Sequence, residues 1–140
     1  MDPLKAGRGL ALRPLMLRDA KALFALVEAN RERLRQWLPW PDANRAVADS
    51  RAYILRVRAL ARRGVAQAHG IWWKDRLVGV VGFVWIDPAN RSAAIGYWLA
   101  LEAEGHGLMT RAVTALLRHG FQTLRLNRIE LRAGVRNRRS

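Results

Sequence analysis

Cysteine is absent from the 140 residues, and lysine occurs only at Lys5, Lys21 and Lys74. Without cysteine the chain cannot form a disulfide, a thiolate metal site or a cysteine nucleophile. A metal site would depend on carboxylates and on the 3 histidines, whose positions show no metal-binding spacing. We therefore expect no metal in the functional site.

Long apolar runs are also missing. The longest, residues 77–86, is about half of the roughly 20 residues that a membrane helix requires. The N-terminal segment is interrupted by Lys5, Arg8, Arg13 and Pro14, which does not fit a targeting segment. We therefore expect a cytoplasmic protein that has no membrane partner.

Acidic residues are few. Lysine and arginine total 25 against 11 aspartates and glutamates, so the formal net charge at pH 7 is +14, and nearly all of the excess is arginine. Because this charge attracts phosphate groups, nucleic acid, a ribosomal surface and an anionic cofactor are all expected neighbours. Charge alone does not choose among them. The length and the 51% hydrophobic content fit one globular domain, residues 1–140.

Hydrophobic periodicity predicts an α/β domain in which helices flank a mixed, mostly antiparallel sheet. The predicted order is β-α-α-α-β-β-β-α-β, after an N-terminal stretch without periodicity that is expected to fray. Its segments are residues 9–14 as an edge strand, 20–30, a short helix around 34–37, 47–63, 66–73, 77–86, 92–99, 109–124 and 129–135. Turn residues separate the three central strands, so two antiparallel hairpins are expected.

The most informative segment lies between the third central strand and the long helix, where two glycines flank His106. Glycine allows a ligand to approach the backbone closely, and the free N–H groups of a first helical turn form an anion site. A diphosphate would fit this place. A Gly-x-Gly sequence before a helix is also common in plain tight turns, so the pattern alone leaves both interpretations open.

The context of this segment resembles a known family. Residues 90–99 (NRSAAIGYWL) followed by residues 104–113 (EGHGLMTRAV) resemble the GNAT superfamily of acetyl-CoA-dependent N-acetyltransferases, and within it the Rim-type ribosomal-protein branch. Other matching features are LRP at 12–14, NR at 30–31, WLPW at 37–40, residues 79–83, LNRIE at 126–130 and NRRS at 137–140. The resemblance covers essentially the whole chain and implies a GNAT-like mixed sheet.

The resemblance also implies where acetyl-CoA would bind. The backbone of residues 97–101 would pair with the pantetheine arm, the N–H groups of residues 105–110 would hold the diphosphate, and Asn137 and Ser140 would lie near the thioester. The residues expected to contact acetyl-CoA are Tyr97, Trp98, Leu99, Leu101, Gly105, His106, Gly107, Leu108, Met109, Thr110 and Asn137. In the same family the Trp37–Trp40 turn lines the acceptor channel, so Trp37 and Trp40 are candidate acceptor contacts.

Two departures from the family pattern concern the site. Glu104 stands where the family has Gln or Arg, with Met109 at the last loop position, and a carboxylate beside phosphates is unfavourable unless it points away. Ala94 stands where relatives often carry a glutamate that acts as general base. The catalytic candidates that remain are Glu130, through a water relay, and Ser140, although a lone glutamate on a strand is more often simply solvated.

The missing base bears on the acceptor. An α-amine with a pKa near 8 is roughly one-tenth neutral at pH 7, whereas a lysine near 10.4 demands about 3.3 kcal/mol more for deprotonation. We therefore expect acetyl transfer to an α-amine, such as a ribosomal-protein N-terminus, by direct attack in a ternary complex. The alternatives are a basic GNAT-like module that binds RNA or a ribosomal surface, and an inactive remnant.

The end of the sequence is the last feature. The family continues beyond the position of Ser140 with another helix and a strand hairpin, so we expect a C-terminally truncated domain whose last strand has an unpaired edge. Such a chain could be a monomer, or a homodimer in which a partner supplies the absent strands.

Overall fold

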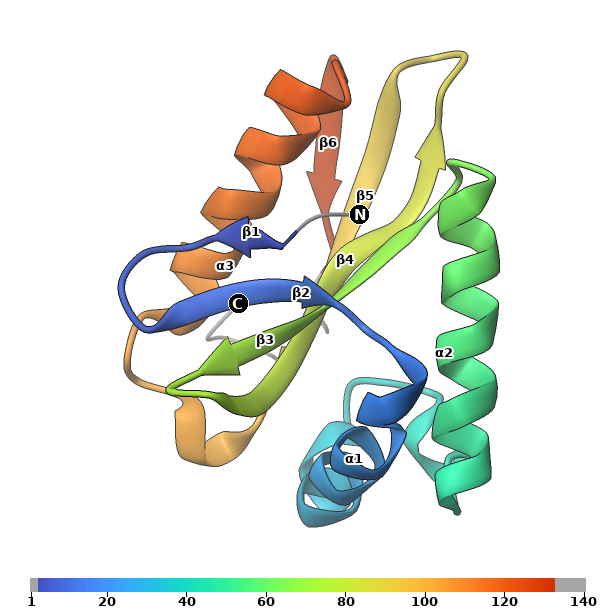
Figure 1. The fold of residues 1–140 in the computed structure, drawn as a ribbon, viewed down its shortest axis with the longest axis vertical. Coiled ribbons are helices and arrows are strands. Elements are labelled where there is room, and N and C mark those ends of the chain that lie inside the picture. Colours follow the sequence, from blue (N-terminus) through green and yellow to red (C-terminus); the bar gives the residue numbers. More distant parts are fainter. Residues whose placement is uncertain (1–2, 133–140) are drawn as a thin grey trace.

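The computed structural model describes residues 3–132. One strongly twisted sheet has the strand order β1-β2-β3-β4-β5-β6, with α3 on one face and α1 and α2 on the other (Figure 1). The strands are β1 (Leu4–Lys5), β2 (Leu10–Pro14), β3 (Gln67–Trp73), β4 (Arg76–Asp87), β5 (Ser92–Leu99) and β6 (Arg128–Leu131). The helices are α1 (Ala20–Leu34), α2 (Val47–Arg62) and α3 (Leu108–Arg118). The predicted α/β class is confirmed.

The sheet is mixed, as predicted. Neighbouring strands from β1 to β5 are antiparallel, whereas β5 and β6 are parallel. The β3–β4 hairpin closes on Lys74 and Asp75, whose φ angles of 51° and 64° are those of a tight hairpin turn that matches the twist of the strands. The register of β4 against β5 is interrupted between Phe83 and Trp85, which bends the sheet there.

The prediction that residues 9–14 form the edge strand is wrong, because β1 pairs outside β2. Arg111 of α3 holds this extra strand in place. Its Nε donates to the Ala6 carbonyl at 3.0 Å, and its Nη2 donates to the Arg8 carbonyl at 2.7 Å. A strand of two residues has no periodicity, so the N-terminal stretch that was expected to fray gave no signal of pairing.

The prediction of two short helices between residues 20 and 37 is also wrong. One helix, α1, runs without interruption to Leu34, and Trp37 lies in the turn that follows. Asp19 precedes the helix as predicted, and its Oδ2 accepts a hydrogen bond from the Met16 N–H at 2.8 Å. Asn30 lies inside this helix, and its side-chain amide donates to the Leu26 carbonyl at 2.8 Å.

Two hydrophobic cores lie on opposite faces of the sheet. The core against α3 includes Leu12, Ile71, Phe83, Ile95 and Leu116. The core against α1 and α2 includes Leu15, Leu23, Val27, Ile54 and Val80. Burying a side chain of this size contributes about 1.5–3 kcal/mol, so these cores fix the strand edges and helix ends that surround the site. On α2, Ile54 is fully buried, whereas Val57, Leu60 and Ala61, which were expected to be buried, are half-buried.

The predicted long helix ends earlier than expected, because α3 gives way to a π-helical turn at His119–Thr123. Of the predicted strand 129–135, the described residues contain the part in β6, and residues 133–135 lie outside them. No helix within residues 3–132 is long and apolar enough to cross a membrane. In the same described range, no three histidine or acidic side chains come together in a way that could hold a metal ion.

Candidate functional site

The two glycines before α3 adopt the left-handed backbone conformation that favours glycine. Gly105 has a φ of 84° and Gly107, the residue that precedes the helix, has a φ of 71°. A Cβ atom at either position would meet no atom of the described residues within 4 Å, so these residues leave the space over the loop open. The first helical hydrogen bond runs from the Arg111 N–H to the Gly107 carbonyl at 3.2 Å. The N–H groups of residues 108–110 therefore have no acceptor inside the helix and are oriented to bind an anion.

A cavity of about 380 Å³ lies at this helix start, between the end of β5 and the C-terminal end of α1. Its wall is part backbone and part aromatic and apolar side chain. The lining residues are Arg33, Leu34, Trp37, Leu38, Tyr97, Trp98, Leu99, Glu104, Gly105, Gly107, Leu108, Met109 and Thr110. We call this space the loop cavity.

The edge of β5 that faces away from β4 runs into the loop cavity. In the described residues, the pairing of β6 with β5 ends opposite Ile95, whose carbonyl accepts the Arg132 N–H at 2.8 Å. Because backbone groups alternate along a strand, the N–H and C=O groups of Tyr97 and Leu99 point to the same side as those of Ile95. This edge can pair with an extended chain that carries amide groups.

Two side chains of α1 hold the segment that joins this edge to the glycine loop. The Asn30 Oδ1 accepts a hydrogen bond from the Leu101 N–H at 3.0 Å. One turn later on the same helix, the Arg33 guanidinium donates to the Leu99 carbonyl and forms an ion pair with Glu104, with 3.2 Å between Nη1 and Oε1. Among residues 3–132, the part of the edge without a backbone or side-chain partner thus consists of both backbone groups of Tyr97 and the N–H of Leu99.

Eight of the residues expected to contact acetyl-CoA lie in the wall of the loop cavity. They are Tyr97, Trp98, Leu99, Gly105, Gly107, Leu108, Met109 and Thr110. Leu101 is outside the wall, and both of its backbone groups are used, since its carbonyl accepts the Glu104 N–H at 3.1 Å. His106 is also outside; its ring lies 4.6 Å, centroid to centroid, from that of Trp73 in the β3–β4 hairpin. Asn137 lies outside the described residues.

A second cavity, of about 540 Å³, lies between α1, α2 and the sheet. It shares the lining residues Leu38, Tyr97 and Trp98 with the loop cavity, so the two cavities have a common wall that includes the end of β5. The Trp40 ring lies 5.8 Å from that of Trp98, and Tyr53 of α2 is also in the wall. Burial raises the pKa of the Tyr53 phenol, which therefore stays protonated at neutral pH and can donate a hydrogen bond. We call this space the helix cavity.

The two candidate acceptor tryptophans separate between the cavities. Trp37 is in the wall of the loop cavity, and its Nε1 is buried without a hydrogen-bond acceptor in the part of the chain that the structure describes. Trp40 is in the wall of the helix cavity. Arg31 fixes the turn between them and α2, because its guanidinium donates to the Pro41 carbonyl and, at 2.6 Å, to the Asn44 carbonyl.

Of the two catalytic candidates, the described residues contain Glu130, and this side chain is not brought into either cavity. Glu130 of β6 is absent from both walls and lies 3.5 Å from the guanidinium groups of Arg128 and Arg132. Ser140 lies outside the described residues. Two carboxylates do belong to the walls. Asp49 accepts hydrogen bonds from two backbone N–H groups at the start of α2, at 2.9 and 3.0 Å, and Glu104 is held by an ion pair.

Sequence reasoning missed the contribution of α1. Arg33, Leu34 and Leu38 line the loop cavity, and none of them was a candidate. Their spacing places them on one side of the helix end together with Asn30 and Trp37, which is the signal that could have found them.

Comparison with known proteins agrees with this geometry. Residues 9–140 match the acetyltransferase (GNAT) domain. The chain is 32% identical over 139 residues to the ribosomal-protein-serine acetyltransferase of Escherichia coli strain K12, which covers 99% of this chain and 78% of that protein. The fold is similar to that of RimL, a ribosomal alpha-N-protein acetyltransferase solved with coenzyme A, with a TM-score of 0.93 and 29% identity over 97% of this chain and 77% of the other.

A further solved structure is similar over most of the chain. The microcin C7 self immunity acetyltransferase MccE, solved with acetyl-CoA and AMP, has a TM-score of 0.88 and 27% identity over 95% of this chain and 74% of the other. The domain match, the sequence identity and the shared fold all indicate the same family. The chain belongs to the GNAT acetyltransferase family, and Rim-type ribosomal-protein acetyltransferases are among its relatives.

Proposed function

We propose that this protein transfers the acetyl group of acetyl-CoA to an amine, with a protein N-terminal α-amine of ribosomal-protein type as the preferred acceptor. The observation that carries the proposal is that two neighbouring cavities share Tyr97 and Trp98 in their walls. The loop cavity contains the start of α3 and a strand edge, and the wall of the helix cavity includes Trp40 and Tyr53. A two-substrate reaction by direct attack needs such a pair of adjoining sites.

The residues of the loop cavity fit acetyl-CoA. The open space over Gly105 and Gly107 lets a diphosphate approach the N–H groups at the start of α3. The backbone groups of Tyr97 and the N–H of Leu99 can pair with the amides of a pantetheine arm. When bound, acetyl-CoA supplies a thioester whose acetyl group a neutral amine can attack.

The residues of the helix cavity would hold the acceptor. The Trp40 and Trp98 rings provide apolar surface that excludes water, and the protonated Tyr53 hydroxyl can donate a hydrogen bond to an acceptor carbonyl. In the described walls, Asp49 and Glu104 are both engaged with protein groups. An acceptor that reaches this site already neutral therefore suits the protein better than a lysine side chain, because an α-amine has the lower pKa.

A ligand-binding experiment tests the proposal. Acetyl-CoA at 100 times its dissociation constant is expected to stabilise the parent protein by roughly 2.7 kcal/mol, which is several degrees in melting temperature. A Gly107→Glu variant should lose this shift, because a carboxylate side chain would enter the cradle. Gly64→Glu is the matched control, since Gly64 follows α2 with a φ of 75° and also has no atom of the described residues within 4 Å of its Cβ position. A well-folded parent without a shift would exclude acetyl-CoA binding by these residues.

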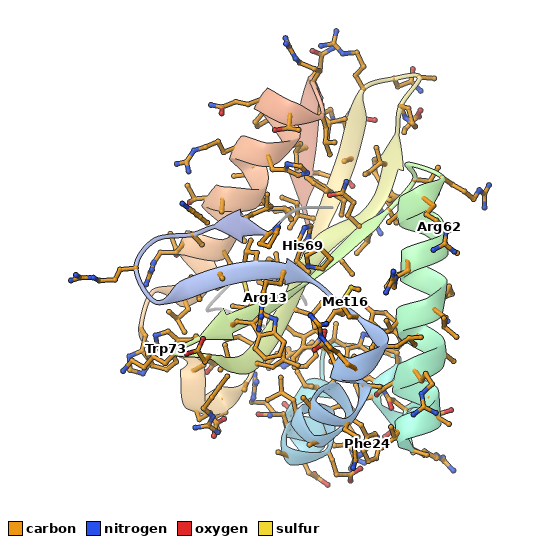
Figure 2. The ribbon with its side chains drawn as sticks, in the orientation of Figure 1. Arg13, Met16, Phe24, Arg62, His69 and Trp73 are labelled. Carbon is orange, nitrogen blue, oxygen red and sulfur yellow. The ribbon has the colours of Figure 1, made fainter. Side chains whose placement is uncertain are left out.

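The arginine-rich face of α2 is a candidate contact for the anionic surroundings of such an acceptor. Arg51, Arg58 and Arg62 follow one side of the helix, and Arg62 projects outward in Figure 2. In the described residues none of the three forms an ion pair. If nucleic acid binds here, its affinity should fall steeply with salt. Binding of RNA without a response to acetyl-CoA would favour a binding module over an enzyme.

A further inference from the structure

The first position of the glycine loop carries a negative charge inside the loop cavity. Glu104 belongs to the wall together with Gly105 and Gly107, and 17% of its side chain is exposed. A carboxylate at this position repels a diphosphate at the helix start, and partial burial weakens the screening of that repulsion by solvent and salt. The Glu104 side chain therefore disfavours the same anion that the backbone N–H groups of the loop and helix start favour.

Arg33 is placed to counter this charge. Its guanidinium reaches across from α1 and binds the Glu104 carboxylate, with 3.2 Å between Nη1 and Oε1, and it also donates to the Leu99 carbonyl. The side chain is 22% exposed, and its Nε is buried without a partner among the described residues. One guanidinium thus connects the end of the open strand edge with the start of the diphosphate cradle.

No other described cation has this position. Arg33 is the one lysine or arginine in the described wall of the loop cavity. The neighbouring arginines are used elsewhere: Arg31 binds carbonyl groups of the turn before α2, Arg35 lies near Glu32 and Asp42, and Arg111 binds carbonyl groups of the β1–β2 connection.

We propose that Arg33 is a positioning residue for the coenzyme, which neutralises Glu104 and fixes the strand edge relative to the diphosphate cradle. This inference rests on the proposed function, because it concerns the same coenzyme site. It explains how a loop with a glutamate at its first position can accept a diphosphate. It also predicts that the two residues depend on each other: the loss of Arg33 is harmful chiefly because Glu104 is present.

A double-mutant cycle tests the dependence. Coenzyme A affinity is measured by calorimetry for the parent, Arg33→Gln, Glu104→Gln and the double variant. We expect Arg33→Gln to weaken binding about tenfold, which is the factor for one partly screened unit charge. Glu104→Gln should bind at least as tightly as the parent, and the double variant should recover most of the loss. Arg35→Ala is the matched control: it removes an arginine of the same helix end that is outside both cavity walls.

A second ligand separates the effect of the Glu104 charge from the effect of Arg33 on the strand edge. Pantetheine lacks phosphates, so its affinity should be nearly the same in Arg33→Gln and in the double variant. Raising the ionic strength should shrink the coenzyme A difference between them. If Arg33→Gln does not fold, Arg33→Lys is measured instead, and it should bind coenzyme A within about threefold of the parent, because the ammonium group keeps both a charge for Glu104 and a donor for the Leu99 carbonyl.

The outcomes are distinguishable. A double variant that binds coenzyme A as weakly as Arg33→Gln, or an Arg33→Gln variant that binds like the parent, would overturn the role given to Arg33 while leaving the coenzyme site intact. An Arg33→Lys variant that folds but no longer binds coenzyme A would overturn it as well. A folded parent that does not bind coenzyme A would overturn the proposed function itself, and this inference with it.

Discussion

Asn30 accepts the N–H of Leu101 at 3.0 Å across the boundary between α1 and the segment that leads from β5 to α3. We expect Asn30→Ala to lower the free energy of unfolding by about 1 kcal/mol, because the Leu101 N–H loses its acceptor and the Leu26 carbonyl loses a side-chain donor. The same change should weaken acetyl-CoA binding about threefold, since this segment connects the two parts of the coenzyme site. Urea unfolding and calorimetry measure the two effects.

Asn127→Ala is the comparison for this variant. Asn127 is exposed and precedes β6, and it contributes to neither cavity wall. Its replacement should change both quantities by less than half as much. Equal effects of the two variants would show that the Asn30 bond is not specific to the site.

Trp37 and Trp40, at the two ends of the Trp37–Trp40 turn, should have separate kinetic effects, because they belong to different cavities. Trp37→Leu is expected to raise KM for acetyl-CoA several-fold with little change in KM for the acceptor. Trp40→Leu should do the reverse, since it removes the ring that lies 5.8 Å from Trp98. Steady-state kinetics with each substrate varied in turn gives the four constants. A rise in KM for the same substrate in both variants would contradict the division into two sites.

The strand edge and the glycine loop were predictable because their signals are local. Tyr97, Leu99, Gly105 and Gly107 lie within eleven consecutive residues in which a β period changes to a helical one at two glycines. The three central strands and their hairpins were predictable for the same reason. These elements could be predicted without knowing which distant segments pack against them.

The contribution of α1 to the site could not be predicted from local sequence signals. Arg33 meets Leu99 and Glu104 at separations of 66 and 71 residues, and a charged residue near a helix end reads as solvated until the fold brings its partners to it. Strand β1 was missed because two residues have no period, and the connection that follows it is bound by Arg111, more than 100 residues away in α3. Long-range polar contacts therefore account for most of what sequence reasoning lacked.

Stability should fall in acid through His69, which lies in β3, near the centre of the sheet in Figure 2. Burial, and to a lesser degree the charge of His119, lowers the pKa of His69 to about 4. The folded state thus binds this proton less readily than the unfolded state, in which histidine has a pKa near 6.5. The stability is complete above about pH 6.5 and is lost as the pH falls from there toward 4.

Between pH 7 and pH 5 this linkage corresponds to about 2 kcal/mol in the free energy of unfolding. Burial lowers the pKa of His119 as well, which adds a loss of the same sign. A His69→Leu variant should remove the larger part of the pH dependence, measured as the difference between urea unfolding free energies at the two pH values. A variant that folds and keeps the full difference would assign the acid sensitivity to other groups.

The acceptor preference should appear in the pH dependence of catalysis. The carboxylates in the described cavity walls are bound to protein groups, so the deprotonated fraction of the acceptor itself is expected to set the rate. For a peptide with a free N-terminus, kcat/KM should rise with pH to a plateau above the α-amine pKa of about 8. For a peptide with a blocked N-terminus and one internal lysine, kcat/KM at pH 7 should be lower by roughly 250-fold, the factor given by a pKa difference of 2.4. Comparable rates for the two peptides at pH 7 would mean that the protein deprotonates its acceptor, and the proposed preference for an N-terminal amine would be wrong.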